Sequence, residues 1–362
     1  MLRVSVIIPV YNAAPWLGAC LDSALGQALR EIEVVCVDDG STDGSVDILL
    51  EYAAKDSRVK VLRQPENLGQ GAARNRGLEE AKGEYAYFMD ADDEMSSADA
   101  LKRLVDEADR ERLDALFFDA ETKLDEGLMV LPPVVNAGGY IRKHDYSGVS
   151  SGRDLFARFV KNREYTVSPC LVLLRRAFLE KCHILFPGER IFYEDNIFMT
   201  RVLLAAERAS HRPWRLYLRK VHAGSTVTST PTMRHLRGYL ACYRDACELL
   251  SGGAWGKRTR VALSERRAVY KLHVRMMAEA NPELASAAEG EMPDAEYAAF
   301  REALVYPFRE KVVNAFRCLR ERGFLFTVKR ILLGKRSNLM ESPRTVAQAT
   351  PCVSMSEGER VV

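Results

Sequence analysis

The sequence predicts an α/β fold, in which helices flank a mainly parallel sheet and a helical extension follows at the C-terminus. Over residues 1–118, short β-branched runs alternate with stretches that carry the period and the start signals of helices. Parallel strands need a crossover between them, so this alternation indicates parallel pairing. Polar clusters follow several of the expected strands. Parallel sheets bind ligands beyond the carboxyl ends of their strands, and we expect a site at that edge.

Each expected element of this first region corresponds to a short run of residues. Apolar, β-branched runs predict four strands, at 4–10 (VSVIIPV), 32–39 (IEVVCVDD), 59–64 (VKVLRQ) and 84–92 (EYAYFMDAD). Between them, amphipathic spacing or a Ser, Thr and Asp start predicts helices at 15–29, 40–56 and 70–83.

The regular alternation ends after residue 118. A fifth strand is expected at 114–121 (DALFFDAE), and a stretch containing Gly and Pro follows it. Farther on, the pattern predicts a helix at 153–161 and a strand that runs into a Ser/Thr loop at 215–230. Helices are expected from about residue 231, and a polar tail of low order from 341.

Composition and charge exclude several classes of protein. The chain has 362 residues, 47% of them hydrophobic, and a net charge of +2, so no overall field attracts nucleic acid. The eight cysteines form no CxxC pair and no zinc-like spacing, which indicates reduced thiols. The apolar N-terminal run is too short for a signal peptide, and no run has the length of a membrane-spanning helix. We therefore expect a cytoplasmic enzyme with no nucleic-acid partner.

The stretch YFMDADDE, residues 87–94, places four carboxylates almost side by side at the end of an expected strand. Two unit charges about 4 Å apart repel by about 4 kcal/mol at an effective dielectric of about 20. Either these side chains spread into water as an acidic turn, or they bind a cation. Oxygen ligands spaced one residue apart suit Mn²⁺ or Mg²⁺, with phosphates completing the shell. Because three other polar strand ends share this edge, we favour the cation.

Two further clusters follow the second and third strands. Asp38 and Asp39 precede Gly-Ser-Thr, so they either cap a helix or accept a hydrogen bond from a base N–H, such as N3–H of uracil. The run NLGQGAARNRG, residues 67–77, contains GxG, but Arg74 occupies the third glycine position of a dinucleotide fingerprint. We favour a glycine loop at a helix N-terminus, where free N–H groups and Arg74 can meet a phosphate or a base.

Together these motifs resemble glycosyltransferase family 2, the inverting nucleotide-sugar enzymes of the GT-A fold. The first four motifs fall within about the first hundred residues, in the family's order and spacing, and we recognise no family motif beyond about residue 235. The resemblance implies a GT-A domain over 1–235, with a nucleotide-binding half (1–118) and an acceptor half (119–235). A helical extension (236–340) and a disordered tail (341–362) would follow. The motifs are SVIIPVYN (5–12), VVCVDDGSTDGS (34–45), NLGQGAARNRGL (67–78), FMDADD (88–93) and FYEDNIF (192–198).

The resemblance also implies roles for individual residues. Asp39 would read the uracil edge, and Arg74 would contact base or phosphate. In the DxD motif, here DAD, Asp92 would be the main ligand of Mn²⁺ or Mg²⁺, and Asp90 would lie at the ribose and the metal. The full set of expected nucleotide-sugar contacts is Pro9, Tyr11, Asn12, Asp39, Gly71, Arg74, Asn75 and Asp90.

Inverting transfer needs a base that takes the proton of the acceptor hydroxyl. Glu194 and Asp195 match the family's acidic pair, and we expect Asp195 to be the base and Glu194 to support it or contact the acceptor. A plain helix N-cap is the alternative explanation of this pair. His222 is a further candidate phosphate or metal contact, although a lone histidine near a strand end is more often structural.

Residues 300–336 mix aromatic, aliphatic and many basic side chains, a composition typical of a membrane-surface helix. An ordinary packed pair of amphipathic helices has equal weight. The predicted function is transfer of a sugar, from a UDP-linked donor, to a hydroxyl of a glycan or lipid-linked acceptor, with peripheral contact to the inner face of the membrane. Two alternatives remain, an inactive nucleotide-sugar binding scaffold and a sugar-phosphate nucleotidyltransferase. The latter should carry a Gly/Arg/Lys-rich loop where PVYNAAPW stands.

Overall fold

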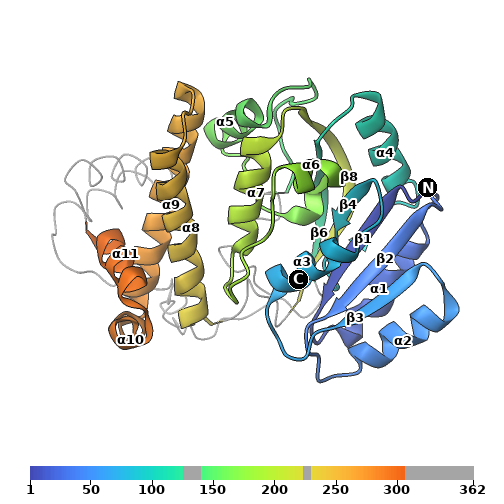
Figure 1. The fold of residues 1–362 in the computed structure, drawn as a ribbon, viewed down its shortest axis with the longest axis horizontal. Helices are drawn as coiled ribbons and strands as arrows, with labels where there is room; N and C mark the ends of the chain where they lie inside the picture. Colours follow the sequence, from blue (N-terminus) through green and yellow to red (C-terminus); the bar gives the residue numbers. More distant parts are fainter. Residues whose placement is uncertain (125–139, 223–229, 306–362) are drawn as a thin grey trace, which may run out of the picture.

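The computed structural model describes residues 1–124, 140–222 and 230–305. Within them, one eight-stranded sheet has the order β3-β2-β1-β4-β7-β6-β8-β5 (Figure 1). Its strands are β1 Val4–Val10, β2 Ile32–Asp38, β3 Val59–Arg63, β4 Tyr85–Phe88, β5 Glu94–Met95, β6 Ala115–Leu124, β7 Val172–Arg175 and β8 Ala209–Val221.

The sheet is mixed, with four parallel strands on its N-terminal side and a second parallel pair, β6 and β8, beyond β7. Strands β3, β2, β1 and β4 pair in parallel, with Val10 level with Asp38 and Ile7 level with Phe88. Strand β7 runs antiparallel to both β4 and β6, and β5 runs antiparallel to β8. The predicted α/β class and the five predicted N-terminal strands are confirmed, while β5 and β7 are additions. The carboxyl ends of β1 and β2 lie at the same edge of the sheet, as the alternation of strands and helices in the sequence predicted.

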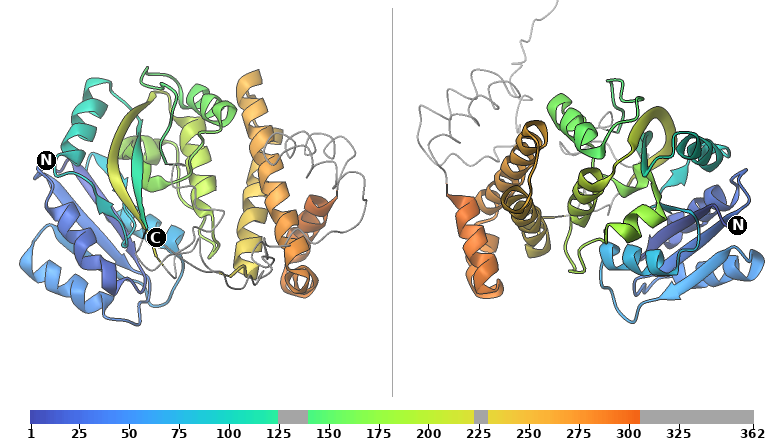
Figure 2. Two further views of the ribbon diagram at one scale, coloured as in Figure 1. Left: turned by 180° about the vertical axis from the view of Figure 1, so that it is seen from behind. Right: turned by 45° about the horizontal axis from the view of Figure 1, so that its top comes forward.

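Apolar side chains alternate along β1 and so supply two cores, one on each face of the sheet. Val6 and Ile8 pack with α1 and α4, whereas Ile7 packs on the opposite face with Phe156 of α5 and Phe198 of α7. Helices on both faces therefore enclose the sheet (Figures 1 and 2). These helices are α1 Ala14–Leu25, α2 Ser45–Lys55, α3 Gln70–Glu80, α4 Ala100–Arg110, α5 Gly152–Asn162, α6 Arg176–Lys181 and α7 Glu194–Ala205.

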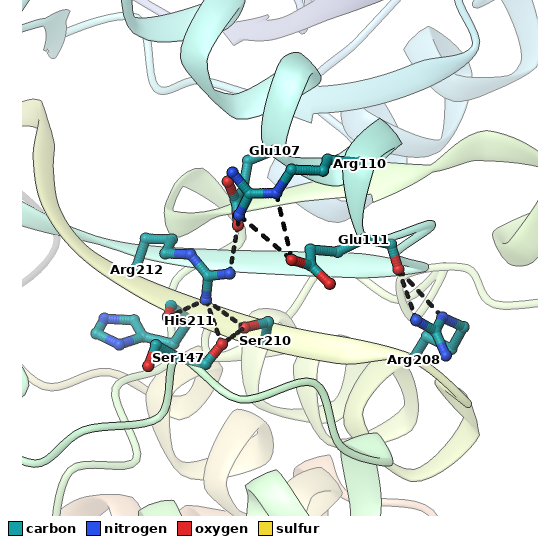
Figure 3. A network of polar contacts seen from close by, with 8 residues as sticks. All are labelled: Glu107, Arg110, Glu111, Ser147, Arg208, Ser210, His211 and Arg212. Carbon is teal, nitrogen blue, oxygen red and sulfur yellow. Dashed lines mark hydrogen bonds and ion pairs between the residues drawn. The ribbon is translucent and has the colours of Figure 1, made fainter.

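Helix α4, which was not among the predicted helices, is bound to the start of β8 by a polar network (Figure 3). Glu107 is buried, and its Oε1 accepts hydrogen bonds from Arg110 and from Arg212 of β8. Arg212 also donates to Ser210 Oγ at 2.7 Å, and Arg208 Nη2 donates to the Glu111 carbonyl at 2.8 Å. The network holds the beginning of the strand whose far end carries residues of the site.

In the described part of the chain, four helices follow the sheet. Two of them, α8 and α9, lie beside α5 and α7, and the other two, α10 and α11, lie on the outer side of α8 and α9, away from the sheet (Figures 1 and 2). Ile197 of α7 is buried in the same cluster as Leu240 of α8, Val274 of α9 and Phe300 of α11, so these helices share a core with α7. This confirms the predicted helices of the C-terminal region as far as Val305. The helices are α8 Met233–Gly252, α9 Lys257–Ala280, α10 Pro282–Glu291 and α11 Asp294–Leu304.

Two predictions for the C-terminal region fall largely outside the described residues. The proposed membrane-surface segment 300–336 is described only as far as Val305, and the tail 341–362 is not described. Among the described helices, none combines the length and the apolar character needed to cross a bilayer.

Candidate functional site

Two neighbouring cavities lie where the polar strand ends meet, and Gln70 and Asp92 line both of them. The first, here called the β1 cavity, has a volume of about 460 Å³ and is lined by Pro9, Tyr11, Asn12, Asp39 and His222 among others. The second, the α7 cavity, has a volume of about 190 Å³, and its walls include Arg74, Asp90, Glu194 and Asp195. The structure thus brings together the nucleotide-binding residues and the acidic pair that the sequence predicted, except Gly71 and Asn75.

Asn12 connects the loops that follow β1 and β2 at the rim of the β1 cavity. Its Oδ1 accepts the backbone N–H of Thr42 at 2.8 Å, and its own N–H donates to Ser41 Oγ at 3.1 Å. The residue has a φ of 50°, a left-handed conformation that asparagine adopts more readily than most residues. Tyr11, beside it, stays 47% exposed, so its ring is available to a ligand.

Asp39 is buried and holds the glycine loop in place. Its Oδ1 accepts from Gln64 Nε2 at 2.6 Å and from the Leu68 N–H at 2.7 Å, and its Oδ2 accepts the Gly69 N–H at 2.8 Å. Helix α2 begins at Ser45 with no side-chain cap, so the helix-cap explanation of the Asp38–Asp39 pair is wrong.

The three aspartates after β4 point to three different partners. Asp90 Oδ1 accepts from Arg74 Nη2 at 2.8 Å, and Asp93 Oδ1 accepts the backbone N–H of Lys220 at 2.7 Å. Asp92 Oδ2 lies 3.0 Å from Nε2 of His222. Burial, followed by the charge of Asp90, raises the pKa of Asp92, and burial with the charges of both neighbours raises the pKa of Asp93 well above its ordinary value. The acids therefore do not simply spread into water.

His222 belongs to the site, at the end of β8. Its ring stacks on the indole of Trp16 from α1, with centroids 3.8 Å apart, and its side chain is largely buried. Stacking fixes the plane of the imidazole, so Nε2 faces Asp92. Trp16 was not a predicted site residue, because its apolar helical spacing marked it only as core.

Arg74 is a buried link between the two halves of the chain, and a contact of its guanidinium with base or phosphate stays a prediction. Its Nη1 donates to Glu194 Oε1 and its Nη2 to Asp90 Oδ1, both at 2.8 Å. Burial alone would lower the pKa of Arg74, but the two carboxylates raise it above its ordinary value. The guanidinium is thus held in its charged form at the floor of the α7 cavity.

Gly71 and Asn75 face the segment that leads to α7. A Cβ on Gly71 would stand 3.0 Å from the Pro187 carbonyl oxygen and 3.1 Å from Glu194 Cγ, so glycine allows this close approach. The amide of Asn75 binds both the N–H and the carbonyl of Phe186, each at 2.9 Å. These contacts give both residues a positioning function, and a direct contact with a nucleotide sugar stays a prediction.

Glu194 and Asp195 form the first turn of α7, after Tyr193 with a φ of 66°. No side chain caps this helix, so the N-cap explanation of the pair is wrong. Burial, followed by the charge of Glu194, raises the pKa of Asp195 to about 7, against the opposing effects of Arg74 and Asn196. A carboxyl group with a pKa near neutrality is suited to accept a proton.

Other residues of the two cavities were missed by sequence reasoning. Arg234, from α8, and Arg190 both line the β1 cavity, and the Arg234 guanidinium lies over the Phe192 ring at 4.1 Å. Burial, followed by the charge of Arg190, lowers the pKa of Arg234. Neither residue stands in a motif. Gln70, by contrast, lies inside the glycine loop and could have been found there.

Comparisons with known proteins show which family this chain resembles. Residues 5–128 match the family described as Glycosyl transferase family 2. This part of the chain is a glycosyltransferase family 2 domain. An uncharacterized glycosyltransferase of Bacillus subtilis, EpsJ, is 31% identical over 228 residues, which cover 63% of each chain. The match therefore spans less than two thirds of that relative.

Two further similarities concern larger or more distant proteins. The poly(ribitol-phosphate) beta-glucosyltransferase of Bacillus spizizenii is 32% identical over 212 residues, covering 58% of this chain and 31% of its own. The structure of S. aureus TarS 1–349 in complex with UDP-GlcNAc superposes with a TM-score of 0.59, at 22% identity and over 92% of each chain. This likeness confirms the predicted GT-A fold, in which the matched residues supply strands β1 to β6.

Proposed function

We propose that the chain is an inverting glycosyltransferase, which moves a sugar from a UDP-linked donor to a hydroxyl of a glycan or lipid-linked acceptor in cell-surface polysaccharide synthesis. One observation carries the proposal, namely that Asp92 and Gln70 line both cavities. A donor with its nucleoside in the β1 cavity would have its diphosphate at Asp92 and its sugar in the α7 cavity, beside Asp195. The relatives support the reaction class, since one acts on a ribitol-phosphate polymer by its name.

The β1 cavity offers the contacts that a uridine needs. Tyr11 presents an exposed ring at one wall, and Asp39 lies at another. A carboxylate has about four acceptor positions, and Asp39 uses three for the loop, which leaves it able to accept N3–H of uracil. TarS, a fold neighbour, has been seen with UDP-GlcNAc.

The donor set at Asp92 fits a divalent cation of the Mg²⁺ or Mn²⁺ type. In the described part of the chain, no three His, Cys, Asp or Glu side chains form a metal cage. Mg²⁺ is usually held by one or two carboxylates together with substrate phosphates, and Asp92 with His222 or Asp90 supplies that smaller set. When bound, such a cation would neutralise charge on the departing diphosphate.

In the proposed reaction, the acceptor hydroxyl gives its proton to Asp195. The acceptor oxygen forms a bond to the anomeric carbon while the bond from that carbon to the diphosphate breaks, and its electron pair leaves on the diphosphate. Attack and departure take place on opposite faces, so the configuration inverts. Glu194 is engaged with Arg74, and this leaves Asp195 as the carboxylate suited to the proton transfer.

Arg190 and Arg234 line the β1 cavity together with Asp92 and would contact the diphosphate there. Two guanidinium groups that line one cavity repel each other, and an anion between them removes the repulsion. The Arg234 Nε atom is buried without a hydrogen-bond partner in the described structure. These arginines provide cationic contacts that the DxD motif alone does not supply.

The direct test is an assay of UDP-sugar cleavage with Mn²⁺ present, first as hydrolysis and then with candidate acceptors. Release of UDP that requires the cation supports the proposal. Tight UDP-sugar binding without cleavage or transfer would instead identify a scaffold. Pyrophosphate release from a nucleoside triphosphate and a sugar phosphate would identify a nucleotidyltransferase.

A further inference from the structure

Hydrogen bonds connect helix α9 to the carboxylate of Asp195 through one residue, Asn196. The backbone N–H and the side-chain Nδ2 of Asn196 both donate to Asp195 Oδ1, at 2.8 and 3.1 Å. At its other end, Asn196 Oδ1 accepts from the Tyr270 hydroxyl at 3.1 Å and from Arg266 Nη2 at 3.3 Å. Neither residue of α9 belongs to a family motif.

The chemistry of the partners determines which way the Asn196 amide faces. A guanidinium can only donate hydrogen bonds, so the amide oxygen must face Arg266. The NH₂ group then necessarily faces Asp195, where it favours the charged carboxylate. The two donors on α9 therefore select the amide orientation that supports an ionised Asp195.

The α9 partners are themselves held rigidly. Tyr270 is only 3% exposed, and the Arg266 guanidinium lies between the rings of Tyr165 and Tyr270, at 4.8 and 4.7 Å. Side chains with fixed rotamers transmit position better than mobile ones. The core shared by α7, α8 and α9 leaves this support little freedom to shift.

Helix α8 supports the same turn from a second direction. A Cβ on Gly238 would lie 2.1 Å from the Phe192 carbonyl oxygen, so glycine allows the α8 backbone to pack directly against the segment before α7. Tyr193 stacks on Tyr239 of α8 with centroids 4.0 Å apart. Both contacts act on the two residues that precede Glu194.

We propose that the C-terminal helices α8 and α9 position the base of the reaction, with Asn196, Tyr270 and Arg266 as positioning residues that orient Asp195 and favour its ionised form. This inference rests on the proposed function, in which Asp195 takes the proton of the acceptor. It gives the region that carries no family motif a direct function in catalysis.

Several charged or titratable groups surround Asp195, and the Asn196 contact opposes those that disfavour its ionised form. Burial and Glu194 disfavour the ionised carboxylate, whereas Arg74 and Asn196 favour it, and the balance leaves its pKa at about 7. Removing the Asn196 amide should therefore raise this pKa further. The groups that interact electrostatically with Asp195 from α3, α7, α8 and the preceding segments are Arg74, Tyr140, Tyr165, Tyr193, Glu194, Tyr239 and Cys242.

The test compares Asn196→Ala and Tyr270→Phe with a matched control, Tyr243→Phe. Tyr243 is as buried as Tyr270, and its hydroxyl donates to Glu302 Oε1 at 2.9 Å, between α8 and α11 and away from Asn196. Donor cleavage or transfer is measured against pH, together with the affinity for UDP and Mn²⁺. In Asn196→Ala, the midpoint of the pH profile should rise by about one unit, because the ionised carboxylate loses a hydrogen bond.

The catalytic rate constant of Asn196→Ala at neutral pH should fall by about tenfold, with UDP affinity unchanged, because supporting residues typically contribute 10–100-fold. Tyr270→Phe should also raise the pH midpoint and lower the rate constant, but by smaller amounts than Asn196→Ala. Tyr243→Phe should have the pH midpoint and the rate constant of the parent. A purely structural role of the network would lower the melting temperature but leave the pH midpoint in place, and that result would overturn the inference. Tyr270→Phe removes one oxygen atom and decides the matter if Asn196→Ala does not fold.

A second measurement does not depend on turnover. The ¹³C signal of the Asp195 carboxyl group, assigned with Asp195→Asn, reports its titration in the parent and in the variants. A parent that cleaves no nucleotide sugar would contradict the proposed function, yet an upward shift of this titration in Asn196→Ala would still support the network. An unchanged titration in both variants would overturn the inference whether or not the parent is active.

Discussion

At the scale of single residues, two adjacent acids on α7 have opposite environments. Glu194 is buried against the guanidinium of Arg74, which satisfies its charge. Asp195 accepts from the backbone N–H and the side-chain amide of Asn196, and burial raises its pKa to about 7. One acid is therefore held in an ion pair, and the other has a pKa suited to exchanging a proton, so we expect a structural and a reactive member of the pair.

The first prediction concerns Asp195 as the base. The parental transfer rate should rise with pH and level off above an apparent pKa of about 7, since only the ionised carboxylate accepts a proton. In Asp195→Asn the rate should fall by about 10²–10⁴, the usual contribution of a general base, while UDP and Mn²⁺ still bind. Steady-state kinetics measures the transfer rate, and calorimetry measures the binding of UDP and Mn²⁺. Transfer at the parental rate would move the base elsewhere, with Glu194 the next candidate.

The second prediction separates binding from chemistry at Asp92. Asp92→Asn replaces a charged oxygen ligand with a neutral amide, so Mn²⁺ should no longer strengthen the binding of UDP. Thermal shift with UDP, with and without Mn²⁺, is the measurement, because ligand at 100 times its dissociation constant adds about 2.7 kcal/mol of stability. Asp195→Asn serves as the matched control, since it should keep the Mn²⁺ effect. An unchanged Mn²⁺ effect in Asp92→Asn would remove this residue from the metal site.

At the scale of elements, α3 and α7 meet through contacts that the sequence pattern could only partly predict. The parallel strands β1 to β4 were predictable because β-branched runs such as VSVIIPV have one clear structural solution, and β1 has the predicted bounds. β5 is only two residues long, too short to show a periodicity. β7 has four residues and lies in an apolar run that suits a helix equally well, so the sequence pattern did not identify it as a strand. Arg74 was predicted for the site, but its two carboxylate partners come from elements far apart in sequence.

The third prediction tests this link between elements. Arg74→Met should lower the free energy of unfolding by about 3 kcal/mol, because it leaves the carboxylate of Glu194 buried without its cation. Arg76→Met, on the same helix, is the control. Arg76 is 47% exposed in its pairs with Glu79 and Glu80, so its loss should change stability by less than about 1 kcal/mol. Urea unfolding of both variants is the measurement, and equal effects would contradict a special structural role for Arg74.

At the scale of the whole molecule, the site is assembled from both ends of the described chain, from Pro9 to Arg234. Residues within motifs, such as Asp39 and Asp92, could be predicted because their position after a strand determines where they lie. Arg234 and Tyr270 could not be predicted, because their contribution depends on how α8 and α9 pack against α7. Helical periodicity indicates which face of a helix is buried, but not which element it packs against. Even within a motif, the partners of a residue can be hidden from the sequence. Asp39 accepts from the backbone N–H groups of Leu68 and Gly69, and almost any residue at those positions would provide such a group.

The last prediction concerns the stability cost of a buried base. The folded state raises the pKa of Asp195 from 3.8 to about 7, so the fold binds this proton more tightly than the unfolded chain does. Below about pH 3 the carboxyl is largely neutral in both states, and Asp195→Asn should be about as stable as the parent. As pH rises to about 7, the unfolded parent gains an ionised group that the fold disfavours, and the parent should lose stability relative to the variant. Above pH 7 the difference should level off at about 4 kcal/mol in favour of Asp195→Asn, since one pKa unit corresponds to about 1.4 kcal/mol.

The neighbouring variant Glu194→Gln gives the opposite sign and serves as the control for this prediction. It removes a partner of Arg74 and should destabilise the protein at neutral pH, because one side of a buried ion pair is lost. Chemical unfolding of the parent and both variants between pH 4 and 8 measures the differences. If Asp195→Asn and the parent keep the same stability throughout this range, Asp195 does not titrate near neutrality in the free protein. The pH limb predicted for transfer would then have to come from another group, since a base with an ordinary carboxyl pKa is ionised throughout that range.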